Sequence, residues 1–522
     1  MKRTAVAALL LLAAAACNKA GTARMHDAQT LVIAQQREPM SLNPALENGQ
    51  SQTEWGLMLF SFLVKADDRG RLVPDAAQAV PTLQNGGIST DGKTITYHLR
   101  PGVKFADGVR LTAQDALWSI EAINNPANNV QSRYGYDRIA KAEAPDDRTL
   151  VLHLKQPFAP LLTLVLAPQG FPIFPKHLLA KYRDFNHIAF DAKPVGSGPY
   201  VVDRWLRGDR VVMHANPYYF GGKPAIEHLT MRFVPDAQAA ANLLHTHEIG
   251  LYFNSQDYSQ FPVLKGMSGY HLYSTPVAGV GAIIFDTQNP NVSLPAVRRA
   301  LVQAIDVDAV VRKAYRGAVD AHSAGTGLFF WAYDRRAYPD TSYEPAAARS
   351  LLAHRNLSVQ IIIQAGTPGD AVAANDIAQY ERQAGVNVSV KQFNISQFVA
   401  PAQEGGPVYG GKFDLALYPF VNGDDPDTTD QFACANVPPK GYNKSRICDP
   451  QIDALLAAGR STFDASKRKA IYARLEARLH ELMPYALIYQ RREIDVADSR
   501  LQNISPSIDS LFWNAAAWRY AP

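Results

Sequence analysis

Stretches of alternating apolar and polar residues recur along the chain, each bounded by turn residues or followed by a helical repeat. Residues 94–99 alternate as a half-buried strand does, directly after the turn signal Asp91-Gly92. Thr112 and Asp115 have the spacing of a capping box, and apolar residues then recur at helical intervals up to Ile123. The pattern over 91–123 therefore predicts a β-turn-β-turn-α unit.

The same alternation of strand and helix patterns continues along the rest of the chain. Strands are predicted at 30–34, 149–154, 200–205, 210–214, 226–234, 282–286, 359–364, 386–390 and 413–418. Helices are predicted at 51–62, 157–166, 237–244, 295–304, 371–383 and 465–481. Because strands alternate with helices, the predicted fold class is α/β. The basic residues on the last helix are interpreted as a solvated face: Lys467, Arg468, Lys469, Arg474 and Arg478.

Length and composition narrow the class of protein. A chain of 522 residues is too long for one ordinary domain and suggests two to four. Hydrophobic residues make up 47% and charged residues 19%, which is typical of a globular protein. The net charge of +4 is small, and both signs are interspersed, so nothing indicates a nucleic-acid-binding surface.

The first residues have the pattern of an export signal. Lys2 and Arg3 precede an apolar stretch, 4–16, that is too short to span a bilayer. This stretch runs into Ala14-Ala15-Ala16-Cys17, which resembles a bacterial lipobox. The resemblance implies a lipoprotein signal peptide at 1–17, a lipidated Cys17 and a polar tether at 18–26. A plain secretory signal is the alternative, because Leu is more usual than Ala14.

Two cysteines remain once Cys17 is assigned to the lipid. They are Cys434 and Cys448, and export to an oxidising compartment favours a disulfide between them. On the chain-entropy estimate, this disulfide contributes about 3 kcal/mol of stability. Two free thiols are the alternative.

Three strings of sequence together resemble a known family. They are EPMSLNPA at 38–45, DGKTITYHLRPGVKFADGVRLTAQDALWSIEAI at 91–123 and PVGSGPYVVDRWLRGDRVVMHANPYYFGGKPAIEHLTMRFVPDAQAAANLLHTHEI at 194–249. They resemble the extracytoplasmic solute-binding proteins of ABC importers, peptide/nickel-binding family 5. The resemblance implies a type II periplasmic-binding-protein-like fold, with two lobes joined by a hinge and an additional small domain.

The resemblance also implies the division of the chain and its partners. Lobe I is expected at 27–55, 193–275 and 491–522, the small extra domain at 56–192, and lobe II at 276–490. Such a protein captures short peptides or similar solutes outside the cytoplasmic membrane and delivers them to a permease and its ATPase subunits. We expect a monomer, periplasmic or otherwise extracytoplasmic, held to the membrane by its lipid only, with no cofactor and no bound metal.

The most site-like stretch is an acidic loop after the strand predicted at 413–418. It contains Asp425-Pro426-Asp427, which resembles a loop of the family. In peptide binders of the family, an acidic residue three positions earlier takes the peptide amine, and here that position is Asn422. An amide supplies no charge, so either Asp424 substitutes or the ligand lacks a free amine. Asn422, Asp424 and Asp425 are therefore the predicted polar anchor, and a solvated turn is the alternative.

Other residues are predicted to face the ligand. They are Tyr418, Phe420 and Trp331 for packing, with Gly49, Gln50, Ser51 and Gln364 at the cleft. Core packing is the alternative for the aromatic run Phe329-Phe330-Trp331. A nickel chelate, an oligosaccharide or an opine is the alternative cargo, and an exported hydrolase is a third hypothesis. The chain has no G-x-S-x-G, H-E-x-x-H, P-loop, dinucleotide fingerprint or Cys-x-x-Cys, so the sequence argues against an enzyme.

Overall fold

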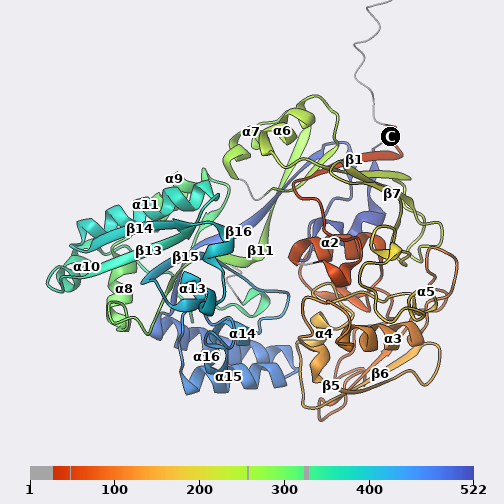
Figure 1. The fold of residues 1–522 in the computed structure, drawn as a ribbon, viewed down its shortest axis with the longest axis horizontal. Coiled ribbons are helices and arrows are strands. Elements are labelled where there is room, and N and C mark those ends of the chain that lie inside the picture. Colours follow the sequence, from red (N-terminus) through yellow and green to blue (C-terminus); the bar gives the residue numbers. More distant parts are fainter. Residues whose placement is uncertain (1–26, 48, 256–257, 323–328, 522) are drawn as a thin grey trace, which may run out of the picture.

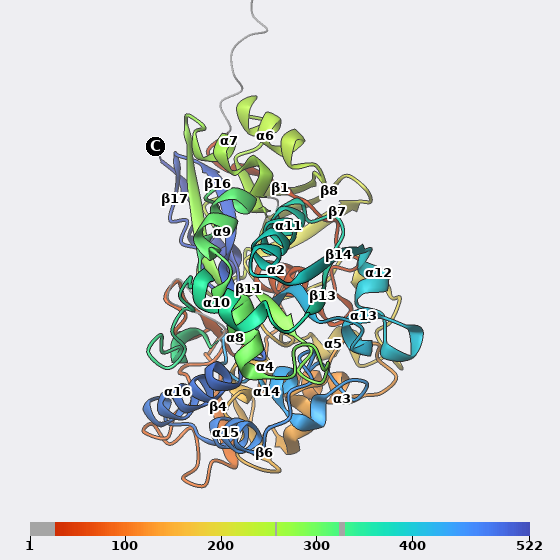
Figure 2. The same cartoon turned by 90° about the vertical axis from the view of Figure 1, so that its left-hand side faces the viewer.

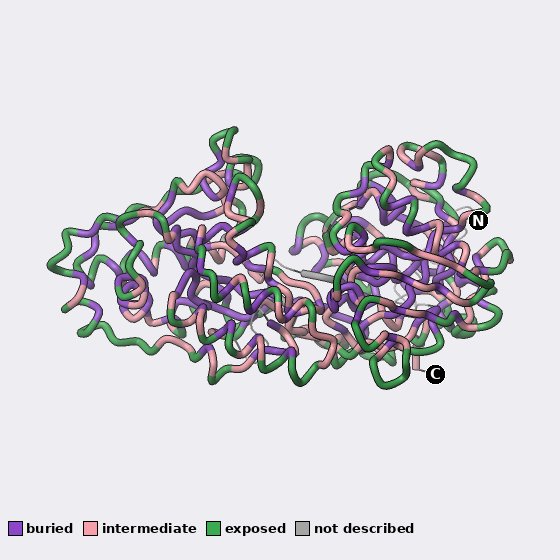
Figure 3. The backbone as a smooth tube through the Cα atoms, turned by 90° about the horizontal axis from the view of Figure 1, so that it is seen from below, coloured by how far each residue is buried: buried purple, intermediate pink, exposed green. Residues whose placement is uncertain are grey.

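The computed structural model describes residues 27–47, 49–255, 258–322 and 329–521. The predicted signal peptide, the tether and Cys17 lie outside these residues. Two lobes lie side by side, with the N-terminal part of the chain in one and the region between β11 (Tyr270–Phe285) and β16 (Tyr485–Asp498) in the other (Figure 1). Seen from below, the buried residues gather in the interior of each lobe (Figure 3).

The largest sheet in the described residues has 11 strands and passes through both lobes. It is mixed: β1 is parallel to β9 and β10, β13 is parallel to β14 and β15, and the remaining pairs are antiparallel. In spatial order its strands are β14 (Asn387–Phe393), β13 (Ser358–Gln364), β15 (Leu415–Val421), β11 (Tyr270–Phe285), β16 (Tyr485–Asp498), β10 (Leu251–Ser255), β1 (Thr30–Gln35), β9 (His228–Phe233), β8 (Arg210–Ala215) and β7 (Tyr200–Leu206), with β12 (Asp320–Ala321) beside β16.

Two long strands, β11 and β16, connect the halves of this sheet. They pair antiparallel from Tyr270↔Asp498 at one end to Ile284↔Tyr485 at the other. Their register shifts between Pro276 and Val280, where residues 277–279 of β11 lie opposite Arg491 alone. Such a bulge bends a strand locally. The lobe boundary expected at 490/491 falls in this bulge, and the one expected at 275/276 lies directly before it.

The N-terminal lobe and residues 56–192 share one continuous core. Leu31 of β1, Phe105 and Trp518 belong to the same cluster of buried side chains. Around this core lie α2 (Gly49–Leu59), β2 (Val64–Ala66), β3 (Leu72–Pro74), a sheet of β4 (Thr94–His98), β6 (Thr149–Leu154) and β5 (Ile139–Glu143), and the helices α3 (Ala113–Asn124), α4 (Leu161–Leu164) and α5 (Lys176–Leu179).

Helices cover both faces of the sheet in the second lobe. Ile361 and Ile363 face one core and Ile362 faces the other, because side chains alternate along a strand. On one side lie α8 (Pro295–Gln303), α9 (Val307–Tyr315), α10 (Pro345–Leu352) and α11 (Pro368–Gln383); on the other lie α15 (Pro450–Ser461) and α16 (Ala465–Leu482). Figure 2 shows α11 above β13 and β14, with α15 and α16 below.

Shorter elements complete the fold. The helices are α6 (Ala237–His245), α7 (Phe261–Lys265), α12 (Ile395–Phe398), α13 (Pro407–Gly410) and α14 (Thr429–Phe432), and the small strands are β17 (Leu501–Gln502) and β18 (Arg519–Tyr520). The 3-10 helices are η2 (Pro44–Leu46), η3 (Tyr136–Arg138), η4 (Ala189–Asp191), η5 (Tyr258–Gln260), η6 (Phe330–Ala332), η7 (Ala402–Glu404), η8 (Cys434–Asn436) and η9 (Leu511–Ala517). Cys434 and Cys448 form a disulfide with an S–S distance of 2.14 Å.

Local sequence signals explain most of these elements. The capping box is confirmed: the Thr112 backbone N–H donates to Asp115 Oδ2 at 2.8 Å, and α3 begins at the next residue. The helix predicted at 157–166 is wrong, because only the four residues of α4 are helical there. The solvated basic face predicted on α16 is wrong at Arg468, which is 5% exposed.

Candidate functional site

A cavity of about 460 Å³ opens between the two lobes, beside the crossing strands. In α/β sheets, ligands bind outside the carboxyl ends of parallel strands. Two such ends meet here, because β1 ends at Gln35 and β13 ends at Gln364. We call this space the inter-lobe cavity. Its lining includes Gln36, Arg37, Tyr258, Lys313, Tyr315, Arg316, Gln364, Asp370, Pro419, Tyr489 and Arg491.

One face of β16 runs along the inter-lobe cavity. Side chains alternate between the faces of a strand, so Tyr489, Arg491 and Glu493 share a face. Tyr489 and Arg491 line the cavity. Arg492 lies on the opposite face, where its Nε donates to Asp320 Oδ2 at 2.7 Å. The strand thus presents one arginine to the cavity and fixes its neighbour away from it.

Strand β16 is joined to α2 by a hydrogen bond at Glu493. Gln50 Nε2 donates to Glu493 Oε2 at 2.9 Å, so the predicted cleft residue Gln50 contacts β16 directly. Burial raises the pKa of Glu493 well above its usual range, and the negative charges of Asp495 and Glu54 add to this effect. In the same region Gln35 Nε2 donates to Glu54 Oε2 at 2.9 Å.

The N-terminus of α2 holds the other two residues predicted at the cleft. Gly49 has a φ of 57°, a left-handed conformation in which a side chain is strained. Ser51 is half-buried, and its hydroxyl has no hydrogen-bond partner among the described residues. Gly49, Gln50 and Ser51 therefore form the first turn of α2.

Within the acidic loop, Asp425 serves the fold. Its two carboxylate oxygens accept hydrogen bonds from Nη1 and Nη2 of Arg468, both at 2.7 Å. The ring of Trp331 lies against the same guanidinium, with its centroid 5.6 Å from Cζ of Arg468. Asn422 Nδ2 donates to the backbone oxygen of Asp425 at 3.2 Å. Arg468 therefore neutralises the charge of Asp425, which the sequence analysis predicted to be part of the ligand anchor.

Asp424 differs from its neighbour because it lies against another carboxyl. It is 4% exposed, as is Asp509 from the C-terminal segment. Gln169 Nε2 donates to Asp509 Oδ1 at 2.9 Å, but neither oxygen of Asp424 accepts a hydrogen bond from a donor in the described residues. Burial and the adjacent Asp509 raise the pKa of Asp424 well above its usual range. Asp424 is thus a buried acid at the contact between the lobes, and not part of a solvated turn.

Two of the three aromatic residues predicted to pack against a ligand, Tyr418 and Phe420, lie on the face of β15 opposite to that of Pro419. Phe420 is 1% exposed and packs in the core in an edge-to-face contact with Tyr485, with the ring centroids 5.4 Å apart. Tyr418 shares that face and lies beside Lys444, whose Nζ is 4.9 Å from the ring centroid. Pro419, between them, lines the inter-lobe cavity. The prediction for Phe420 therefore chose the wrong face of a strand, because period-two alternation alone does not say which face meets the cavity.

Sequence reasoning missed Arg37, Arg491 and Asp370, which line the cavity. Tyr315 Oη donates to Asp370 Oδ1 at 2.6 Å, and burial raises the pKa of Asp370. The position of Asp370 in the first turn of a helix that follows the predicted strand 359–364 was the one available signal. Arg491 gave none, because 485–498 was not predicted as a strand.

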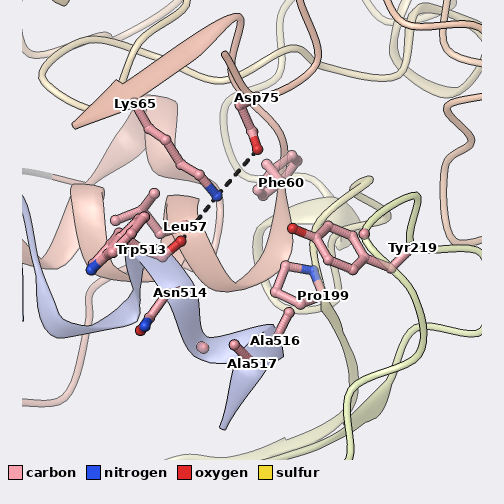
Figure 4. Close-up of a pocket in the computed structure, with 12 residues that line it drawn as sticks. Leu57, Phe60, Lys65, Asp75, Pro199, Tyr219, Trp513, Asn514, Ala516 and Ala517 are labelled. Atoms are coloured by element: carbon pink, nitrogen blue, oxygen red, sulfur yellow. Dashed lines mark hydrogen bonds and ion pairs between the residues drawn. The ribbon is translucent and has the colours of Figure 1, made fainter. Parts of the chain in front are cut away.

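A second cavity, of about 230 Å³, lies within the first lobe (Figure 4). Lys65 Nζ lies 3.2 Å from Asp75 Oδ1 and donates to the backbone oxygen of Trp513 at 2.9 Å. Tyr219 and Pro199 form the opposite wall. The residues that line this cavity all come from 57–75, 199–221 and 513–517, so movement of the second lobe does not open or close it.

The described residues form neither a metal-binding cluster nor a membrane-spanning helix. No group of three or more His, Cys, Asp or Glu side chains there is arranged to hold a metal ion. Likewise, no helix in this part of the chain combines the length and the apolar character needed to cross a bilayer.

Comparisons with known proteins identify the family. The family model described as "Bacterial extracellular solute-binding proteins, family 5 Middle" matches residues 71–442. Protein XP55 of Streptomyces lividans is 29% identical over 504 residues, which covers 91% of this chain and 87% of that protein. Probable di/tripeptide-binding protein 5 of Pseudomonas aeruginosa is 27% identical over 492 residues, covering 87% and 89% of the two chains.

A solved structure supports the fold. The oligopeptide-binding protein AppA from Bacillus subtilis, in complex with a nonapeptide, superposes with a TM-score of 0.76 at 21% identity and covers 94% of this chain and 99% of that one. The type II periplasmic-binding-protein-like fold is thereby confirmed. The chain belongs to family 5 of the bacterial extracellular solute-binding proteins, which are the non-enzymatic, extracytoplasmic substrate-binding components of ABC importers.

Proposed function

We propose that this protein binds short peptides in the inter-lobe cavity and delivers them to the permease of its importer. The observation that carries the proposal is the position of the cavity, which both lobes line and which lies beside the bulged strands that connect them. A ligand that contacts both lobes stabilises the closed state relative to the open one. The names of the Pseudomonas and Bacillus relatives, which describe peptide binders, support peptides as the cargo.

The division into lobes is part of the proposal. Lobe I comprises 27–55, 193–275 and 491–522, lobe II comprises 276–490, and 56–192 forms the extra domain. The bulge between Pro276 and Val280, where β11 faces Arg491, supports the two crossing points. Gln490, which is fully buried, strengthens this view because its Nε2 donates to the backbone oxygens of Val277 and Gly279, both at 2.8 Å. A single side chain thus holds the bulge about which the lobes move.

Among the predicted anchors, Asp424 is the residue that we retain for a ligand ammonium. Asp425 is engaged by Arg468, and Asn422 supplies no charge. Asp424 is a buried acid beside Asp509, and the arrival of an ammonium would compensate the negative charge of both. The start of α2, residues 49–51, remains a proposed neighbour of the cargo, whereas Tyr418 lies on the face of β15 turned away from the cavity and Trp331 packs against Arg468.

The proposal also places the protein on a membrane surface. The lipobox-like sequence that ends in Cys17 supports a lipid anchor, a cleaved signal peptide and a tether at 18–26, with the folded part acting as a monomer. Incorporation of a labelled fatty acid by cells that express the full chain tests this. The Cys17→Ser variant must lose the label, and a labelled variant would refute lipidation at this residue.

Peptide binding is tested with the purified protein and a panel of di- to nonapeptides, oligosaccharides and nickel–histidine. We expect peptides to raise the melting temperature and to reduce the radius of gyration measured by small-angle scattering, because closure brings the lobes together. The peptide must be recovered intact. A response to sugars or nickel chelate alone, or cleavage of the peptide, would refute the proposal.

A further inference from the structure

The cavity shown in Figure 4 is a second hollow of the protein, separate from the one between the lobes, and we call it the first-lobe cavity. Three segments that are far apart in the sequence enclose it: 57–75, 199–221 and 513–517. Its walls are mostly apolar, and two of them, Leu57 and Phe60, are 5% and 2% exposed. Apolar walls with a few convergent polar groups are the usual form of a small-molecule site.

Lys65 is the cation of this cavity, and its ammonium is only partly used. Its Nζ lies 3.2 Å from Asp75 Oδ1 and donates to the backbone oxygen of Trp513 at 2.9 Å. An ammonium carries three N–H donors, so one is left for a further partner. Burial opposes the charged form of Lys65, but Asp75 and Tyr219 favour it, and the pKa of Lys65 is raised overall. Lys65 therefore stays charged at neutral pH.

Tyr219 brings a second donor to the same space. Figure 4 shows its phenol oxygen pointing into the cavity. The hydroxyl makes no hydrogen bond to another residue that the structure describes, although the charges of Lys65 and Asp75 act on it. Burial raises the pKa of Tyr219, so the hydroxyl stays protonated. The ring is held from behind, because a Cβ on Gly221 would lie 2.6 Å from its Cε1.

The other polar side chains of the wall are already engaged. Asp75 is 5% exposed; one of its oxygens faces the ammonium, and the other accepts a hydrogen bond from the backbone N–H of Phe62 at 2.9 Å. The amide of Asn514 donates to the backbone oxygen of Asn503 at 2.9 Å and accepts from Trp518 Nε1 at 3.0 Å. Neither side chain therefore needs a ligand.

These groups define the charge of a suitable ligand. Lys65 and Asp75 balance each other, so an anion would be repelled by Asp75 and a cation by Lys65. Two donors remain, the third N–H of Lys65 and the hydroxyl of Tyr219. They match one oxygen acceptor on an uncharged molecule, because a buried donor gains free energy when it finds an acceptor.

The size and the walls define the body of the ligand. An engineered protein cavity of about 150 Å³ lined by aliphatic and aromatic side chains binds benzene. The first-lobe cavity, of about 230 Å³, has room for one aromatic ring with a small substituent. The rings of Phe60, Trp513 and Tyr219 belong to its wall, and aromatic rings pack favourably on one another.

We propose that the first-lobe cavity binds a small uncharged aromatic molecule that carries one oxygen acceptor, with phenol as the simplest example. Lys65 and Tyr219 would donate to the oxygen, and the apolar walls would pack on the ring. This inference goes beyond the proposed function and does not depend on it, because no residue of the second lobe lines the cavity. The ligand and the cargo would therefore occupy the protein together.

The test measures the affinity of the wild-type protein for phenol, toluene, benzoate and benzylamine by saturation-transfer difference NMR. We expect phenol to bind about tenfold or more tightly than benzoate or benzylamine, because the balanced ion pair does not compensate a further charge. A saturating tripeptide is expected to leave phenol binding unchanged. No binding of phenol, equal binding of a charged probe, or displacement of phenol by the tripeptide would overturn the inference. Failure of every peptide to bind would instead overturn the proposed function and leave the phenol result intact.

A matched pair of variants tests the hydroxyl of Tyr219. Tyr219→Phe is expected to weaken phenol about tenfold relative to toluene, because only phenol loses a hydrogen bond. Tyr218→Phe removes the same group from the neighbouring residue, which is 44% exposed and does not line the cavity, and is expected to change neither affinity. An unchanged ratio of phenol to toluene affinity in Tyr219→Phe would refute the role of its hydroxyl.

Filling the cavity tests the location of the ligand. Ala516 lines the wall, and Ala516→Leu places a larger apolar side chain there. This variant is expected to lose the binding of both phenol and toluene while it retains peptide binding. Retention of phenol binding would place the ligand elsewhere and overturn the inference. The comparison of charged with uncharged probes in the wild type needs no variant and decides the question if a variant fails to fold.

Discussion

The two ends of the contact between the lobes differ in charge and in packing. At the inter-lobe cavity, Arg37 and Arg491 line open space. At the acidic loop, Asp424 and Asp509 are buried against one another. The basic end leaves room for an anion, whereas the acidic end places two carboxyls together with no cation between them in the described residues. Contact between these two carboxyls is therefore favourable only when a proton or a cation compensates the charge.

The largest effect is expected from breaking the support of the acidic loop. Arg468→Ala leaves Asp425 buried without its guanidinium, and loss of one partner of a buried pair costs about 3–5 kcal/mol. Urea unfolding measures this loss, and the loop is expected to become more accessible to proteases. Lys467→Ala, on the exposed side of α16, is the control and is expected to change stability by less than about 0.5 kcal/mol. A loss at Arg468 as small as that of the control would show that the pair does not hold the loop.

A lone buried acid tests whether burial alone explains the behaviour of Asp424. Glu381 of α11 is fully buried, neither of its oxygens has a partner among the described residues, and burial raises its pKa well above the usual range. The cost of burying Glu381 is smallest below the pKa of the unfolded chain, where the acid is neutral in both states, and it grows as pH rises toward the raised pKa. Glu381→Leu is therefore expected to gain about 2 kcal/mol at pH 8 and less at pH 5, measured by chemical unfolding. A gain independent of pH would contradict this account.

The carboxyl pair itself is expected to give a smaller effect of the same sign. Because the pKa of Asp424 is raised, the contact with Asp509 is most favourable at acidic pH and weakens as pH rises through the raised pKa. Asp424→Asn replaces one acid by an amide that can donate to Asp509. We expect the variant to be more stable than the wild type at pH 7.5 by about 1 kcal/mol, which thermal unfolding shows as a higher melting temperature. The two melting temperatures are expected to converge toward pH 4.

The control for the carboxyl pair is Glu404→Gln, an exposed acid on η7, which is expected to show no such pH-dependent difference. If Asp424→Asn lowers the melting temperature at pH 7.5, the ionised pair stabilises the contact between the lobes. The difference drawn here between the acidic end and the basic end would then be wrong.

The smallest effect is expected at Arg37. Its side chain is exposed, so solvent screens its charge, and Arg37→Gln is expected to change the affinity for a peptide by no more than about threefold. Calorimetry at low and high salt sharpens the result, because added salt is expected to reduce the difference between the variant and the wild type. A change of about tenfold or more would show that Arg37 is a main contact of the peptide.

The sequence predicted elements well where one face of an element is buried and its ends carry turn or capping residues, as for α3 after Thr112. It failed for β16, whose residues are buried almost without interruption and which therefore shows no alternation. The fold class needs only the order of such elements, and for that reason it was predictable. The site depends on contacts between distant segments, and those leave little trace in a single sequence.

Two residues show this limit directly. Arg468 fits the pattern of an exposed helical face, and nothing local reveals that Asp425, 43 positions away, packs against it. Phe420 fits the composition of a ligand wall, but its neighbour Pro419 is the residue that lines the cavity. Asp424 and Asp425 are adjacent and chemically identical, yet Asp424 faces Asp509 and Asp425 faces Arg468. Only the packing of the lobes decides this difference.

The crossing strands have one more consequence. The second lobe leaves the first through β11 and returns through β16, and its entry and exit lie opposite each other, with Ile284 paired to Tyr485. The whole lobe is thus a single contiguous insert whose ends are neighbours in space. An exchange of this segment between relatives would transplant most of the lining of the inter-lobe cavity in one piece, with two junctions that need to be matched only in strand register.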